Sequence, residues 1–167
     1  LATQPQLALQ HVEYLEDSSN KLTLTQIISV NPTLHWQTAS NDQLRFGYSD
    51  SSYWLRAKIR NTSDTNNWLF VIDNEILNYI DFYQFDAKQQ QIQAFTTGNK
   101  RVFSSRPISH RKFLFALDIP AQQTHTLLLR VKSDTSLTIP LSIWSPQHFF
   151  ENDQAHLLLL GIFTGCL

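Results

Sequence analysis

Residues 53–60 read Tyr53-Trp54-Leu55-Arg56-Ala57-Lys58-Ile59-Arg60, and this stretch decides the fold class because apolar and polar side chains alternate along it. Successive side chains of an extended strand point to opposite faces. The odd-numbered residues therefore share one face, and the even-numbered residues, Trp54 and three basic side chains, share the other. This period of two predicts a β-strand with one face in the core.

Similar segments recur on both sides of this stretch, separated by turns rich in Asn, Asp, Ser, Gln and Pro. Further strands are expected at residues 11–15, 68–72, 79–85, 91–95, 113–117, 126–132 and 137–144. About eight strands with turns every eight to twelve residues, and little helix, are typical of a β-sandwich. We predict an all-β fold of the jelly-roll type, without internal repeats.

Two helices are expected beside these strands. Thr23 is a favourable N-cap residue, so residues 24–28 are predicted to form a short helix that ends before Pro32. Proline is also common at the first position of a helix, and Pro146 therefore opens a second helix that continues through His156.

The second helix leads into the uncharged run LLLLGIFTGCL at residues 157–167. Eleven helical residues rise about 16 Å, against a hydrocarbon core of about 30 Å. We expect this run to be the truncated start of a transmembrane helix. The chain would then divide into a globular domain at residues 1–150 and a linker with a membrane segment at residues 151–167.

Composition excludes several classes of function. The net charge is −1, with 13 Lys and Arg against 14 Asp and Glu, which argues against a nucleic-acid partner. The only cysteine, Cys166, lies in the apolar run, so the globular part has no disulfide, no thiolate zinc site and no thiol nucleophile. The six histidines lack metal-ligand spacing, and no nucleophile elbow or phosphate-binding loop is present. We therefore expect neither an enzyme nor a cofactor.

An ordered set of segments carries a family resemblance. These segments are residues 14–17, 24–28, 44–47, 53–56 with Asn61, Trp68, 79–83, 129–131 and 140–144. Their order resembles the type 2 extracellular domain of bacterial seven-transmembrane receptors with diverse intracellular signalling modules. The most specific block is Phe46-Gly47 followed by Tyr53-Trp54-Leu55-Arg56 and Asn61, and the resemblance extends from Val12 to about Phe150.

This resemblance implies a jelly roll similar to carbohydrate-binding modules. It also implies a periplasmic domain of a bacterial inner-membrane protein and a cytoplasmic output, such as a diguanylate cyclase or a histidine kinase. Residues 161–165, Gly-Ile-Phe-Thr-Gly, resemble the start of the family's first membrane helix.

The outward face of the strand at residues 53–60 is the candidate ligand site. If the neighbouring strands meet it, Trp54, Arg56, Asp81, Tyr83 and Arg130 form one polar and aromatic floor. An aromatic ring can stack on the C–H face of a sugar, and Arg donates to hydroxyls or a carboxylate. The alternative is ordinary surface architecture, in which Arg and Asp pair across strands and a loop half-buries the Trp.

The resulting expectation is a periplasmic ligand-sensing domain of a membrane-bound receptor. Expected partners are a small polar ligand, such as a carbohydrate, the receptor's own transmembrane bundle and, in a homodimer, a second copy of the chain. Ligand binding would shift the populations of two packings, with residues 146–156 joining the domain to the membrane. A non-signalling carbohydrate-binding module or adhesin, and a protein-interaction domain, are the alternatives; a glycosidase would need two facing carboxylates in a cleft.

Overall fold

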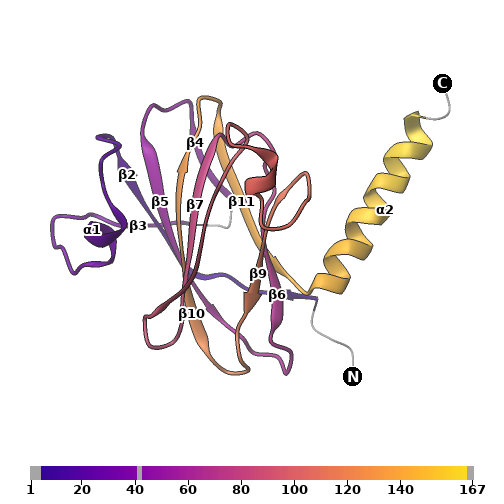
Figure 1. Cartoon of the computed structure of the whole chain (residues 1–167), viewed down its shortest axis with the longest axis horizontal. Helices are drawn as coiled ribbons and strands as arrows, with labels where there is room; N and C mark the ends of the chain where they lie inside the picture. Colours follow the sequence, from indigo (N-terminus) through magenta and orange to yellow (C-terminus); the bar gives the residue numbers. More distant parts are fainter. Residues whose placement is uncertain (1–4, 41–42, 165–167) are drawn as a thin grey trace.

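Two antiparallel sheets pack face to face in the computed structural model, which describes residues 5–40 and 43–164 (Figure 1). One sheet contains β2 (Gln10–Asp17), β3 (Gln37–Thr38), β5 (Ser52–Arg60), β7 (Tyr79–Phe85), β8 (Gln91–Thr97) and β10 (Thr124–Lys132). The other contains β1 (Gln6–Leu7), β4 (Gln43–Gly47), β6 (Asn67–Ile72), β9 (Phe113–Asp118) and β11 (Leu137–Trp144). The predicted all-β sandwich is confirmed.

The order of strands in space differs from their order in the chain. The first sheet, called the six-stranded sheet, has the order β3-β2-β5-β10-β7-β8. The second, called the five-stranded sheet, has the order β1-β11-β6-β9, and β4 also pairs with β11. Successive strands such as β5, β6 and β7 lie in alternate sheets, which is the double-sheet connectivity that a jelly roll requires.

The hydrophobic core lies between the sheets. The inward side chains predicted for β5 are buried, with Leu55 and Ile59 fully inaccessible to solvent. Aromatic rings join the two sheets, since Phe82 of β7 stacks on Phe115 of β9 with 4.3 Å between ring centroids. A substitution in this aromatic layer therefore changes the packing of both sheets.

A short helix covers part of the outer face of the six-stranded sheet. Helix α1 (Leu24–Ile28) begins after Thr23, as predicted, and its capping box is complete. The Thr23 hydroxyl accepts from the Gln26 N–H, and the Gln26 side chain accepts from the Thr23 N–H at 2.9 Å. Ile27 is the buried residue of this helix and packs against the sheet.

A longer helix lies beside the five-stranded sheet. Helix α2 (Pro146–Thr164) begins at the predicted proline. A hydrogen bond from the Phe149 N–H to the Ser145 carbonyl closes its first turn. It continues through residue 150, so the division of the chain there stays a prediction. Among the described helices, none has the length and apolar character needed to cross a membrane. Residues 165–167, which end the predicted membrane segment, lie outside the described residues.

A 3-10 turn, η1 (Phe103–Ser105), interrupts the long connection between β8 and β9. This connection and the two helices lie outside the two sheets. Their positions determine which outer surfaces are open and which are covered.

Candidate functional site

The five predicted site residues share the outer face of the six-stranded sheet. Strand β10 pairs with β5 on one side and with β7 on the other. Arg130 stands opposite both Trp54 and Asp81, and Leu128 stands opposite both Arg56 and Tyr83. The predicted side chains therefore occupy two neighbouring rows across three strands. Their role in binding stays a prediction.

Trp54 is not an exposed platform for a ligand. Its side chain is 1% exposed and belongs to a cluster with Ile27, Leu128 and other apolar residues of α1 and the sheet. The segment that carries α1 lies over the ring and removes it from solvent. The loop-covered alternative for this Trp is therefore the observed one, and stacking on a sugar would require the cover to move.

Asp81 and Arg130 hold loops together. Oδ1 of Asp81 accepts from Nη1 of Arg101 at 2.9 Å, and Oδ2 lies 3.7 Å from Nη1 of Arg130. Nη2 of Arg130 donates to the carbonyl of Asn20 at 3.1 Å, in the turn after β2. These contacts fix two connections, one on each side of the pair, onto the sheet. Asp81 and Arg130 thus already have protein partners.

Tyr83 lies against Trp54 in a stacked arrangement, with ring centroids 6.4 Å apart and planes 17° apart. Burial raises the pKa of the Tyr83 hydroxyl, and the nearby Asp81 charge adds to this effect. The hydroxyl therefore keeps its proton at neutral pH. Tyr83 completes the packing under α1 and does not line the pocket described next.

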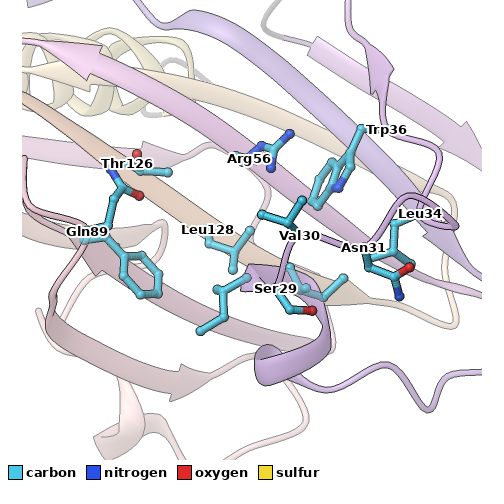
Figure 2. A pocket seen from close by; sticks show the side chains of 12 residues that line it. Ser29, Val30, Asn31, Leu34, Trp36, Arg56, Gln89, Thr126 and Leu128 are labelled. Carbon is cyan, nitrogen blue, oxygen red and sulfur yellow. The ribbon is translucent and has the colours of Figure 1, made fainter.

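A pocket of about 460 Å³ opens beside α1 (Figure 2). Its floor is the sheet, with Arg56 of β5, Thr126 and Leu128 of β10 and Phe85 of β7. The remaining lining residues come from α1, the segment after it and the turn between β7 and β8: Ile27, Ile28, Ser29, Val30, Asn31, Leu34, Trp36 and Gln89. We call this cavity the α1 pocket.

Arg56 is the predicted site residue that lines the α1 pocket. Its guanidinium lies 4.3 Å from the centroid of the Trp36 ring, a cation–π contact. Nε and Nη2 contact Oε2 of Glu13 at 2.8 and 2.7 Å. Nη1 makes no hydrogen bond to the described residues, and about a third of the side chain is exposed. Arg56 is thus held in place while one nitrogen can donate to a ligand.

The α1 pocket combines an apolar surface with dispersed hydrogen-bonding groups. Leu128, Phe85 and Trp36 supply the apolar area, while Asn31, Gln89 and Thr126 supply polar groups at the edges. Pockets of this size and mixture are typical sites for small molecules. Among the described side chains, no three His, Cys, Asp or Glu are grouped so that they could hold a metal ion.

Sequence reasoning missed most of the pocket lining. The strand register would have found Leu128, which stands opposite Arg56, and Phe85, which stands opposite Thr126. Trp36 lies between α1 and β3, in a segment without periodicity, so its sequence carries no signal for a pocket. Gln89 adopts the left-handed region with φ 61° in a tight turn, and its sequence gave no signal for that position.

The first turns of α2 cover part of the opposite outer face. Phe149 is 3% exposed and packs on Leu69, Val71 and Leu114 of the five-stranded sheet. One turn later, Asp153 receives hydrogen bonds from Nε2 of His110 at 3.0 Å and Nη2 of Arg111 at 2.7 Å.

These polar contacts fix the protonation of the pair. Nδ1 of His110 accepts from the Lys112 N–H at 3.0 Å, so Nε2 carries the proton that Asp153 accepts. Burial acts to raise the pKa of Asp153, but the hydrogen bonds from His110 and Arg111 outweigh it, and the pKa lies below the usual range. Asp153 is therefore charged at neutral pH.

A protein-family model matches the part of the chain that forms the sandwich. The model of the 7TMR-DISM extracellular 2 domain matches residues 9–145, which is most of the chain. No curated protein matches the chain. The chain therefore belongs to the 7TMR-DISM extracellular 2 family, the extracellular sensor domain of seven-transmembrane receptors.

Proposed function

We propose that this domain is a periplasmic sensor that binds a small polar ligand, in the first place a carbohydrate, in the α1 pocket. The observation that carries the proposal is the arrangement of Arg56, stacked on Trp36 with one free nitrogen, beside an apolar floor. A sugar ring offers both a C–H face for such a floor and hydroxyls for Arg56, Asn31 and Gln89. No catalytic role is proposed for it.

The signal would pass to the membrane through α2. A ligand that contacts the α1 segment and the floor favours one arrangement of these elements, and the populations shift accordingly. Strand β9 connects the two faces: Phe82 of the six-stranded sheet stacks on Phe115, and the preceding residue of β9, Leu114, has its side chain on the other face of the strand and packs with Phe149 of α2. The partner of α2 would be the receptor's transmembrane bundle, and the output would be a cytoplasmic diguanylate cyclase or histidine kinase.

A thermal-shift screen tests ligand binding. The chain is heated with neutral sugars, uronic acids and amino acids, beside the variants Arg56→Ala and Arg60→Ala. A ligand present at 100 times its Kd stabilises the native state by about 2.7 kcal/mol. This is a rise in Tm of roughly 5–10 °C for a chain of this size.

Arg60 is a suitable control because it lies on the same strand and face but outside the pocket lining. We expect a rise that Arg56→Ala abolishes and Arg60→Ala retains. A ligand whose effect survives Arg56→Ala would contradict the site, and no rise with any of the three classes would contradict a small-molecule sensor.

One observation favours a protein-interaction domain as the second candidate. Ile28 and Val30 at the rim of the α1 pocket are strongly exposed, with relative exposures of 55% and 103%. Exposed apolar side chains at a rim suit a protein surface better than a sugar. A chain that binds no small molecule, and whose partner binding is lost in Ile28→Ser with Val30→Ser, would favour this candidate.

A further inference from the structure

Four connections meet at one end of the sandwich, and we call this set the loop end. They are residues 48–51, 73–78, 98–112 and 133–136. The register places them together, because the start of β7 pairs with the end of β10 and with the end of β8. The start of β5 likewise pairs with the end of β10, and the end of β6 pairs with the start of β9.

Hydrogen bonds and close packing tie three of these connections, residues 73–78, 98–112 and 133–136, to one another. The Asn78 side chain accepts from the hydroxyl of Ser133 at 3.1 Å and from the N–H of Asp134 at 2.6 Å. Lys100 forms an ion pair with Asp134. A Cβ at Gly98, where φ is +138°, would collide with the Asn78 carbonyl, so these two connections meet closely. These three connections thus form one ordered surface, while residues 48–51 are held by the turn after β2, where Asn20 donates to the Asp50 carbonyl at 3.0 Å.

Helix α2 runs towards this loop end. It begins beyond the end of β11, at the other end of the sandwich, where Trp144 pairs with Leu69 near the start of β6. Asp153 then reaches His110 and Arg111, which belong to the loop end. Figure 1 shows the helix rising beside the sandwich in this direction. The uncharged sequence 157–163 follows in the helix and continues the same course.

Exposed apolar side chains gather at the loop end. Tyr48, Ile76, Val102 and Phe103 have relative exposures of 83%, 51%, 72% and 57%. The connections at the opposite end, residues 61–66, 86–90 and 119–123, are all described and contain no exposed large apolar side chain. The connections with exposed apolar side chains are therefore those at the end of the sandwich towards which α2 runs.

The charges of the loop end are largely compensated. Lys112 pairs with Asp73 at 3.0 Å, and Arg111 pairs with Glu75 as well as Asp153. Arg106 donates to the carbonyls of residues 110 and 111 and lies over the rings of Phe103 and Phe113. A partner surface is therefore expected to contact apolar groups, with little dependence on its own charge.

We propose that the loop end rests on the outer surface of the lipid bilayer, with Tyr48, Ile76, Val102 and Phe103 in the interfacial layer. Aromatic and large apolar side chains are favoured at that depth. The inference rests on the proposed function, because it takes residues 157–163 as the route of the chain into the membrane. It adds that α2 is not the only attachment of the domain to the membrane, and that the three connections which carry these side chains fix its orientation there.

Fluorescent labels of known position test this contact. The chain is reconstituted in phosphatidylcholine vesicles and labelled with an environment-sensitive dye at one cysteine at a time. The first sample carries the dye at the native Cys166. The other samples carry Cys166→Ser with Val102→Cys, with Tyr48→Cys as a second loop-end position, or with Gln122→Cys as the control at the opposite end.

We expect lipids brominated in their acyl chains to quench the dye at residues 166, 102 and 48 and to leave residue 122 unaffected. Quenching at 166 without quenching at 102 and 48 would overturn the contact and leave the proposed function intact. No quenching at 166 would overturn the contact together with the route of residues 157–163 into the membrane, while ligand binding in the α1 pocket is tested separately by the thermal shift. A blue shift at 102 that occurs equally without vesicles, and grows with protein concentration, would show that a second copy covers the loop end.

Discussion

The two outer faces of the sandwich are covered by helices of very different length. On the six-stranded sheet, α1 has five residues and spans about 7.5 Å, which leaves the α1 pocket uncovered beside it. On the five-stranded sheet, α2 has nineteen residues, and its first turns cover part of the surface through Phe149 and Asp153. One face therefore leaves a pocket that we propose admits a ligand, and the other holds a helix.

The difference also concerns how easily each cover can move. A helix of one turn and a half is marginal by itself and depends on Ile27 and its capping box for its position. Segments with few buried contacts open at a lower free energy than the core. The α1 segment is thus the part that the proposed ligand would order, while the first turns of α2 are fixed by a buried ring and charged hydrogen bonds.

The largest expected effect belongs to Trp54, which joins the α1 cover to the sheet. Trp54→Ala should lower the free energy of unfolding by about 3–5 kcal/mol, because it removes a fully buried ring. Urea denaturation measures this loss. Trp36→Ala serves as the matched control, since Trp36 is only partly buried and lines the pocket. Equal losses in the two variants would contradict the separation of a structural Trp from a binding Trp.

Phe149 tests the packing of α2 on the five-stranded sheet in the same way. Phe149→Ala should lower the free energy of unfolding by about 3 kcal/mol and increase hydrogen exchange in residues 147–156. The neighbouring Phe150 is 40% exposed, and Phe150→Ala should change stability by less than about 1 kcal/mol. The expectation fails if the two substitutions loosen α2 to the same extent.

Asp153 adds a polar contribution to the same contact. Asp153→Asn should cost about 1–3 kcal/mol, because charged hydrogen bonds from His110 and Arg111 are weakened. The pKa of Asp153 is lowered in the folded state, so its contribution is complete above the usual pKa of about 4. It is lost as the pH falls from there through the lower folded value.

Unfolding curves between pH 6 and pH 3 measure this dependence. The stability difference between the native chain and Asp153→Asn should shrink as the pH falls. Asp134→Asn is the control: Lys100 lowers the pKa of Asp134 too, but solvent screens this exposed pair, so its convergence should be much smaller. A difference that stays constant down to pH 3 would exclude Asp153 as the titrating group.

The smallest effect on stability is expected at His125, a buried residue of β10. Burial lowers the pKa of His125, whose Nδ1 is 2.9 Å from the Gln84 amide nitrogen. The unfolded chain then binds a proton more readily, so stability should fall as the pH decreases through about 6.5. Tm at pH 7.5 and pH 5.5 measures the decrease, and His125→Gln should reduce it. An unchanged pH dependence in that variant would assign the effect to another group.

The sequence allowed the fold to be predicted further than the site. Alternation in residues 53–60 correctly separated Leu55 and Ile59 from Trp54 and Arg56, because one strand face must enter the core. It could not show that Trp54 is covered, because the cover is α1. Nothing in the sequence links that short helix to the strand that holds Trp54. The Asp81–Arg130 pair followed from register, but its engagement by Arg101 and Asn20 depends on connections that only the folded chain brings together.

The central claim is that a ligand in the α1 pocket changes α2 on the opposite face. The most direct measurement is hydrogen exchange of the chain with and without the sugar or uronic acid that gives the largest thermal shift, repeated with Arg56→Ala. We predict altered exchange both in residues 24–36 and in residues 146–156, and no change in the variant. Protection confined to residues 24–36 would contradict the account, since the pocket would then bind a ligand without acting on the helix.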